Sequence, residues 1–282
     1  MRDFSHVRDA LSLNTATLGH NLAGHGAGWA VERVIDACAA RDFGGIVFWR
    51  REIDDAVAIG NRVRAAGLRV DGLCRAPFLV GPLKPAAVMD DFRAAIDMAA
   101  GLQAPVLTIV VGGVEPGTKG VGDSLKRVAE TVAEAAPYAA ARGVKLALEP
   151  LNPVYGGDRS CLVTMRDAVN MVLAIGAGNV GVAVDVYHLW WDTDLARQVT
   201  RLPVGGLMGF HLCDWLAATR DVLLDRGMMG DGVADIRGLR AVVEAAGYAG
   251  PCEVEVFSAS NWWLRDPGEV LDVVVERFRT CC

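Results

Sequence analysis

The stretches VKLALE (Val144–Glu149) and VGVAVD (Val180–Asp185) decide how this chain is expected to fold. In both stretches every second residue is a branched apolar side chain, and the residues between are mostly small or polar and end in a carboxylate. Residues two apart in a β-strand face the same side, so each stretch predicts a buried strand with one face against helices. A helical pattern over Thr164–Ala174 lies between them, which makes this segment a β–α–β unit.

The same unit recurs along the whole chain. Eight strand-length apolar runs are predicted: Leu11–Thr15, Gly45–Trp49, Arg69–Cys74, Pro105–Val111, Val144–Glu149, Val180–Asp185, Leu207–Cys213 and Cys252–Phe257. Helical patterns follow at Ala30–Ala40, Asp54–Ala66, Ala86–Ala100, Gly122–Ala141, Thr164–Ala174, Thr193–Arg201, Ile236–Ala246 and Pro267–Thr280. Several helices are expected to end at a glycine before the next strand: Gly67, Gly101, Gly143, Gly176 and Gly247. Eight units without a linker predict an α/β protein, a single (β/α)8 TIM barrel over residues 1–282; a doubly wound sheet is the alternative, with less apolar edge strands.

Composition excludes several classes of protein. Hydrophobic residues make up 52% of the 282 residues, which excludes disorder, and no apolar run approaches the roughly 18 residues that span a membrane. The net charge is −6 and no segment clusters bases, so nucleic acid is not an expected partner. Seven cysteines without a CxxC pair indicate reduced thiols, and MRDFSHVRDA (Met1–Ala10) lacks the apolar region of a secretory signal, so a cytoplasmic location is expected.

Alternation in the last four strands places one metal-competent side chain inward from each. GLMGFHLC (Gly206–Cys213) and CEVEVF (Cys252–Phe257) follow the same pattern as the two stretches above. The inward residues near the carboxyl ends of these four strands are Glu149, Asp185, His211 and Glu255. Three carboxylates and one imidazole suit Mn²⁺ or Mg²⁺, with Co²⁺ as a further option, whereas a structural Zn²⁺ site favours thiolates. The alternative is a set of buried ion pairs, but one histidine would leave negative charge uncompensated in a closed cavity.

Three further residues are candidates for binding a substrate. His188 follows Asp185 by three residues and could reach substrate oxygens, or it could pack on the neighbouring tryptophans. Asp214 and Arg226 flank the loop after His211, where they would contact a hydroxyl or a ketone unless they are surface charges. The glycine-rich segment RGMMGDGVAD (Arg226–Asp235) is not expected to be helical and is expected to close over the cavity. Weaker candidates, which could equally form salt bridges at the rim, are Asn14, Arg50 and Arg75.

Two motifs carry less information than they first suggest. GGVEPGTKG (Gly112–Gly120) approaches a phosphate-binding loop, but its Thr-Lys order is reversed, so a mobile loop at the barrel mouth is expected. The pairs Trp190–Trp191 and Trp262–Trp263 would suit sugar stacking or a subunit interface.

These motifs resemble the sugar phosphate isomerase/epimerase superfamily of xylose-isomerase-like TIM barrels over essentially the whole chain. The resemblance is carried by LALEPLNP (Leu146–Pro153), GVAVDVYHLWWD (Gly181–Asp192), GFHLCDW (Gly209–Trp215), RGMMGDGVADI (Arg226–Ile236) and EVEVFS (Glu253–Ser258). By resemblance to ketose 3-epimerases, the metal ligands are Glu149, Asp185, His211 and Glu255, and the two glutamates exchange the substrate proton. The same resemblance makes His188 a substrate-binding residue. A departure is the long loop between HLCDW and Arg226, where those epimerases have an arginine shortly after the metal histidine.

The expected activity is a divalent-metal-dependent sugar isomerase or epimerase that acts on a ketose or keto-sugar through an enediolate. The alternative at the same site is a lyase or dehydratase that eliminates from a keto-sugar or a 3-keto-glycoside, including C-glycoside deglycosylation, because both reactions begin with loss of the α-proton. The superfamily also contains inosose dehydratases, hydroxypyruvate isomerases and DNA-repair endonucleases; an endonuclease would need more histidines and a basic groove. A non-catalytic sugar-binding subunit is the remaining alternative. A homo-dimer or tetramer, with a hetero-subunit as a further option, is the expected assembly.

Overall fold

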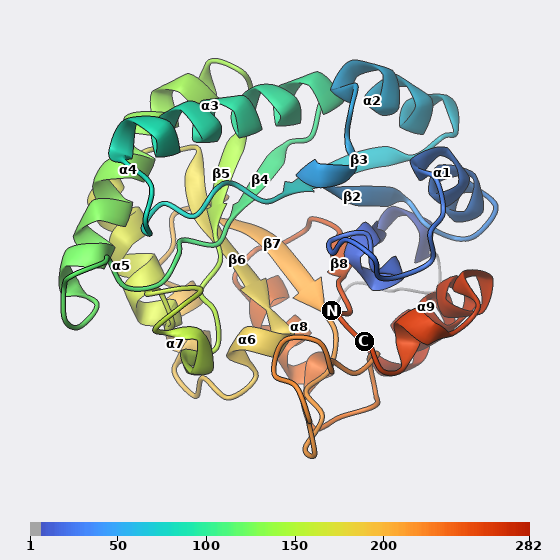
Figure 1. Cartoon of the computed structure of the whole chain (residues 1–282). Coiled ribbons are helices and arrows are strands. Elements are labelled where there is room, and N and C mark those ends of the chain that lie inside the picture. The colour runs from blue at the N-terminus through green and yellow to red at the C-terminus, as the bar shows by residue number, and fades with distance from the viewer. Residues whose placement is uncertain (1–6) are drawn as a thin grey trace.

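A computed structural model describes residues 7–282, in which eight parallel strands form one closed barrel (Figure 1). The strands are β1 (Leu11–Asn14), β2 (Gly45–Trp49), β3 (Arg69–Cys74), β4 (Val106–Ile109), β5 (Lys145–Leu148), β6 (Val180–Asp185), β7 (Leu207–Leu212) and β8 (Cys252–Val254). The helices are α1 (Val31–Ala39), α2 (Ala56–Ala65), α3 (Pro85–Leu102), α4 (Gly122–Ala140), α5 (Met165–Ile175), α6 (Val186–Leu189), α7 (Leu195–Val199), α8 (Ile236–Ala245) and α9 (Pro267–Cys281). Residues 1–6 lie outside the described part. They belong to the segment Met1–Ala10, which is not expected from its sequence to be a secretory signal.

Closure of the sheet confirms the barrel and rules out the doubly wound alternative. The first strand pairs in parallel with the last, with Leu13 opposite Val254. All eight predicted strands and all eight predicted helices are present; β2, β3 and β6 have the predicted bounds, and no end of the other elements differs from the prediction by more than three residues. Within residues 7–282 the one unpredicted α-helix is the four-residue α6, which directly follows Asp185.

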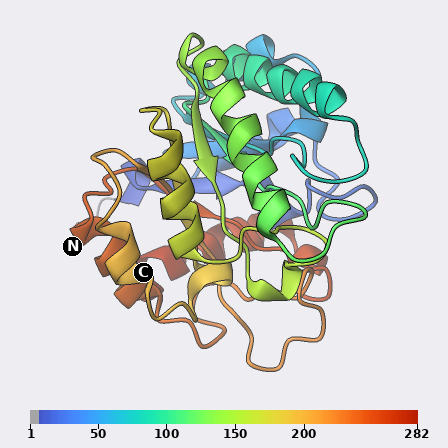
Figure 2. The ribbon, with the colours of Figure 1, turned by 90° about the vertical axis from the view of Figure 1, so that its left-hand side faces the viewer.

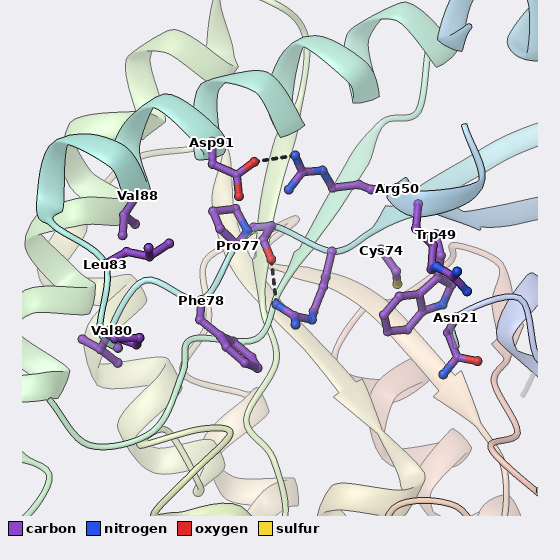
Figure 3. A pocket seen from close by; sticks show the side chains of 15 residues that line it. Asn21, Trp49, Arg50, Cys74, Pro77, Phe78, Val80, Leu83, Val88 and Asp91 are labelled. Carbon is purple, nitrogen blue, oxygen red and sulfur yellow. Dashed lines mark hydrogen bonds and ion pairs between the residues drawn. The ribbon is translucent and has the colours of Figure 1, made fainter. Parts of the chain in front are cut away.

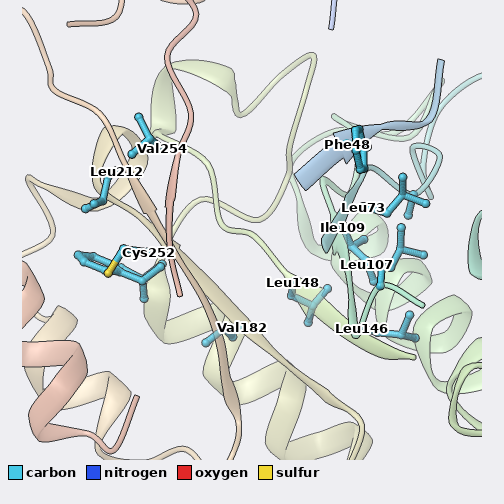
Figure 4. Packing of buried hydrophobic residues seen from close by; sticks show 14 of the residues in the cluster. Phe48, Leu73, Leu107, Ile109, Leu146, Leu148, Val182, Leu212, Cys252 and Val254 are labelled. Atoms are coloured by element: carbon cyan, nitrogen blue, oxygen red, sulfur yellow. The ribbon is translucent and has the colours of Figure 1, made fainter. Parts of the chain in front are cut away.

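Branched apolar side chains from the strands fill the layer between the barrel and the helices (Figure 4). Leu146 and Leu148 of β5 are fully buried there, as are Val182 of β6 and Leu212 of β7. Helices α3, α4 and α5 lie next to one another around this layer, as Figure 2 shows. The helices therefore cover the outer face of the sheet, and the inward face is left to small and polar side chains.

The helix ends confirm four of the five predicted glycine caps and correct the fifth. Gly176 follows α5 with φ +67°, the left-handed conformation that glycine adopts without steric cost. Gly101 does not end α3, which continues to Leu102, and Gln103 takes the left-handed position with φ +59°. A Cβ on Gly101 would lie 3.0 Å from the Cβ of Ala56, so this glycine allows close packing of α3 on α2.

Burial corrects one basis for the expected oligomer. Trp262 and Trp263 are buried within the chain, and the Trp263 indole donates to the backbone carbonyl of Ala16 at 2.9 Å. This pair is therefore not an exposed interface surface, and the homo-oligomer stays a prediction. No helix within residues 7–282 has both the length and the apolar character needed to cross a membrane.

Candidate metal centre

The barrel brings the four predicted ligands together at the carboxyl ends of its last four strands. Glu149 directly follows β5, Asp185 ends β6, His211 lies near the end of β7, and Glu255 directly follows β8. One ligand atom from each residue lies within 4.8 Å of the others, and all four side chains are buried. Active sites of TIM barrels lie at this end of the strands.

Small residues on the inward face make room for this cluster. A Cβ on Gly209 would lie 3.0 Å from the Nε2 atom of His211 and 3.0 Å from the Cβ of Ala183. The pairing of β6 with β7 shifts by one residue here, so that Ala183 pairs with Gly209 and Met208 is passed over. Met208 consequently packs inside the barrel against Ala147 and Ala183 and forms an apolar floor beneath the cluster.

Carboxylates lie against both nitrogens of the His211 ring. The Nδ1 atom lies 2.7 Å from Glu149 Oε1, and the Nε2 atom lies 3.4 Å from Glu253 Oε2. Burial alone would lower the pKa of His211, but the charges of Glu253 and Glu149 outweigh burial and raise this pKa well above its usual value. A metal-ligating histidine commonly has a carboxylate at its other ring nitrogen, and Glu253 lies in the position for that role.

Arg226 lies inside the cluster, although 41 residues separate it from Asp185. Its Nη1 atom donates to Asp185 Oδ2 at 3.4 Å and to Glu255 Oε2 at 3.3 Å. The guanidinium lies over the rings of Tyr187 and Phe257, at 4.4 and 4.1 Å from their centroids. The loop after β7 therefore places a buried cation against the metal-competent carboxylates. Arg226 is not a surface charge, which was the alternative in the sequence analysis.

The charge balance of the cluster fits a divalent cation. Within the described residues, four buried carboxylates (Glu149, Asp185, Glu253 and Glu255) form ion pairs with two groups, Arg226 and the His211 ring. Burial raises the pKa of Asp185 to about 6 and that of Glu255 to about 8; Arg226 opposes both shifts, and the neighbouring carboxylates add to them. A cation of charge +2 would relieve this excess negative charge, and the oxygen-rich donor set suits Mn²⁺ or Mg²⁺.

His188 lies beside the cluster on the short helix α6, and the carboxylate of Asp185 caps this helix by accepting from the backbone N–H of Tyr187 at 2.7 Å. The His188 Nε2 atom is 3.7 Å from Asp185 Oδ2, and the Nδ1 atom accepts from the backbone N–H of Asn152 at 3.3 Å. Burial, together with Arg226, lowers the pKa of His188 well below its usual value. The ring is therefore neutral, with Nε2 directed toward the cluster as a potential donor to a substrate oxygen.

Asp214 is placed differently from the sequence prediction. Its carboxylate accepts from the backbone N–H groups of Trp215, Gly230, Gly232 and Ala234, all at 2.9–3.0 Å. Asp214 is buried and is not among the residues that line the cavity beside the ligands. These hydrogen bonds hold the glycine-rich segment that begins at Arg226. The segment contains no helix, as predicted.

Sequence reasoning missed most of the cavity wall. A cavity of about 60 Å³ beside Glu149, His188, Arg226 and Glu255 is also lined by Trp49, the last residue of β2, and by residues outside the strands: Phe78, Tyr155, Arg159 and Phe257. Asn14, a weaker candidate, lies deeper, where its Nδ2 atom donates to Glu253 Oε1 at 2.5 Å and to Glu255 Oε1 at 2.9 Å. No strand alternation points to Tyr155 or Arg159, because loops and not strands carry them.

A TIM barrel with a buried acid and histidine cluster at its catalytic end defines the class of this protein. A family model described as xylose isomerase-like TIM barrel matches residues 35–281, and the chain belongs to this family. No curated protein matches the chain at a significant level.

Solved structures agree with the family. A protein from Sinorhizobium meliloti 1021 is 42% identical, with 97% of this chain and 98% of that chain covered and a TM-score of 0.90. D-allulose 3-epimerase from Methylomonas sp., solved with D-allulose, is 19% identical, with 97% and 96% covered and a TM-score of 0.73. The IOLI protein, solved with a zinc atom, is 15% identical, with 96% and 97% covered and a TM-score of 0.80. The last two likenesses concern the fold alone.

Proposed function

We propose that this protein is a divalent-metal-dependent isomerase or epimerase of ketoses or keto-sugars. The observation that carries the proposal is the cluster of Glu149, Asp185, His211 and Glu255, whose ligand atoms lie within 4.8 Å of one another. These residues would hold the cation, and the D-allulose bound to a protein of the same fold supports a sugar substrate. Mn²⁺ is the expected metal, with Mg²⁺ and Co²⁺ as substitutes.

A bound divalent cation supplies electrostatic stabilisation of the negative charge that develops on a substrate oxygen when the neighbouring C–H bond loses its proton. Glu149 and Glu255 come from strands three positions apart in the barrel, so their carboxylates approach a substrate from different sides. One glutamate removes the α-proton and the other returns a proton to the opposite face or to the adjacent carbon. His188 Nε2–H and the Arg226 guanidinium are placed to donate hydrogen bonds to substrate oxygens and fix the orientation of the sugar.

Deuterium exchange tests this proposal directly. The purified protein, loaded with Mn²⁺, is incubated in D₂O with a panel of ketoses and 3-keto-glycosides, and the products are read by NMR. Deuterium at the carbon next to the carbonyl, dependent on metal and abolished by EDTA, is the expected result. The absence of exchange on every member of the panel, with the metal shown to be bound, would overturn the proposal.

The same spectra separate the second candidate reaction. Elimination begins with the same proton loss but gives an unsaturated product and releases water or an aglycone. Epimerisation gives a sugar of unchanged composition in which one hydrogen is replaced by deuterium. The two outcomes therefore assign the reaction without a prior choice of substrate.

A further inference from the structure

A second cavity lies beside the metal centre and is not part of it. Its volume is about 510 Å³, and it lies at the ends of β2 and β3 and below the start of α3. Figure 3 shows Trp49, Cys74 and Asn21 at one side of this cavity and an apolar wall of Val80, Leu83 and Val88 at the other. We call it the arginine cavity, because Arg50, Arg51 and Arg75 line it.

The arginine cavity continues the cavity at the metal centre. Trp49, Cys74, Arg75 and Phe78 line both. The cavity at the metal centre measures about 60 Å³, and binding sites for small molecules usually measure about 300–1,000 Å³. A sugar whose carbonyl lies at the metal centre must therefore extend past these shared side chains into the arginine cavity.

The charge of the arginine cavity is opposite to that of the metal centre. Three guanidinium groups line it against a single carboxylate, Asp91, which pairs with Arg50 at 2.6 Å. The Nε atom of Arg50 is buried and has no hydrogen-bond partner within residues 7–282. This excess of positive charge lies in a protein whose net charge is −6, so it is a local feature and not a general property of the surface.

Arg75 is the arginine best placed to meet a ligand, because it lines both cavities. Its guanidinium stacks over Phe78, 3.9 Å from the ring centroid, and its Nη1 atom donates to the carbonyl of Ala76 at 3.1 Å. No carboxylate of residues 7–282 lies within 4 Å of its charged nitrogens. Burial lowers the pKa of Arg75 to about 10; Cys74 and Glu149 oppose this effect, and the charges of Arg159 and Arg50 add to it. An anion bound here would relieve the repulsion between these neighbouring cations.

We propose that the substrate is an acidic sugar, with its carbonyl end at the metal centre and an anionic group, a carboxylate or a phosphate, bound by Arg75 in the arginine cavity. Arginine presents a planar set of donors that matches both anions. Phe78 holds the guanidinium plane, and Trp49 offers an apolar face to the carbon chain between the two ends. This inference rests on the proposed sugar-converting function and adds the class of substrate to it.

Calorimetric titration of the Mn²⁺-loaded protein with three matched ketoses tests the inference. D-fructose is the neutral probe, 5-keto-D-gluconate carries a carboxylate, and D-fructose 6-phosphate carries a phosphate. At least one acid is expected to bind about tenfold or more tighter than D-fructose, the size of a charge-assisted pair, and the acid that does so identifies the anion. Arg75→Gln should bring the affinity for that acid to within about twofold of that for D-fructose, and Arg75→Lys should retain part of the preference.

Arg33→Gln is the matched control, because Arg33 also stacks on an aromatic ring, Trp29 at 4.0 Å, but lies outside both cavities. It should leave all three affinities unchanged. Equal affinities of the parent for acids and D-fructose, a preference that survives Arg75→Gln, or no binding of either acid at about 10 mM would each overturn the proposal. Titrations repeated in EDTA, read beside the deuterium-exchange experiment, separate the anion site from the proposed function. If anion binding depends on Arg75 but no metal-dependent deuterium exchange occurs, the proposed function is overturned and the anion site is retained.

Discussion

The two halves of the barrel mouth differ in charge. Strands β5–β8 end in carboxylates and a histidine that lie against one another, whereas β2 and β3 are followed by Arg50 and Arg75. Asn14, at the end of β1, joins the halves: its Nδ2 atom donates to Glu255, and its Oδ1 atom accepts from the Trp49 indole at 2.9 Å. The ends of β5–β8 thus provide an acidic half suited to a cation, and the ends of β2 and β3 provide a basic half suited to an anion.

Removal of either glutamate from the acidic half should have the largest effect. Glu149→Gln and Glu255→Gln each keep a neutral oxygen ligand and lose the base, so turnover should fall at least about 10²-fold even where metal remains. Deuterium exchange and metal content, measured on the same samples, check this. Exchange at the parent rate by metal-loaded Glu149→Gln would contradict the central step of the proposed mechanism.

Metal should stabilise the protein more strongly at pH 8 than at pH 5. In the metal-free fold the pKa values of Asp185 and Glu255 are raised to about 6 and 8, so the folded state binds protons that the unfolded chain has released. The free energy of unfolding should therefore fall as pH rises from about 4 to 8, and the raised pKa of His211 acts in the same direction. The lowered pKa of His188 acts in the opposite direction below about pH 6.5.

Thermal melts in EDTA and in Mn²⁺ across this pH range measure the difference. At a metal concentration about 100 times the dissociation constant, the gain should be about 2.7 kcal/mol. It should be smaller at low pH, because the ligands must release protons to bind the metal. A metal-induced shift that is constant with pH would contradict the charge balance given above for the acidic half.

His188→Ala should have an intermediate effect. Loss of a hydrogen bond to the substrate should weaken transition-state stabilisation by about 1–3 kcal/mol, measured as a fall in kcat/KM. The metal content should stay unchanged. His25→Ala serves as the control, because this exposed ring also contacts an aromatic side chain, Trp263, away from the cluster. Loss of metal in His188→Ala would instead make His188 part of the ligand set.

The acidic half could be predicted from the sequence far better than the basic half. Alternation within β5, β6 and β8 is local and follows from burial, so it identifies inward carboxylates directly. Even in β7, where the pairing shifts at Met208, the residues after the shift keep His211 inward. Arg75 is only a weaker candidate in the sequence, because its place after a strand suits a salt bridge at the rim equally well. Phe78 and Arg159 lie in loops, and their positions depend on contacts between distant segments that no periodicity records.

The same limit explains the two local errors. Glycine is the residue type expected at a helix cap, but at Gly101 the close contact between α3 and α2 is what requires it. Gln103 adopts the left-handed backbone of the cap instead. Asp214 has the chemistry of a substrate ligand, but four backbone N–H groups occupy its carboxylate. In both cases a tertiary contact decides the role of a residue whose type suits two roles.

The smallest effect is expected for Arg50→Gln in the basic half. The Arg50–Asp91 pair is partly exposed, with 23% and 43% of the two side chains accessible, so its loss should change the free energy of unfolding by less than about 1 kcal/mol. Urea denaturation of the metal-loaded protein measures this change, with Arg62→Gln, whose ion pair with Asp36 lies on the surface, as the matched control. A loss well above that of the control would mean that the guanidinium groups hold the barrel together. An equal, small loss would mean that the Arg50–Asp91 pair contributes little to the free energy of unfolding. Arg50 would then be free to serve a binding surface for an anion without a role in holding the barrel together.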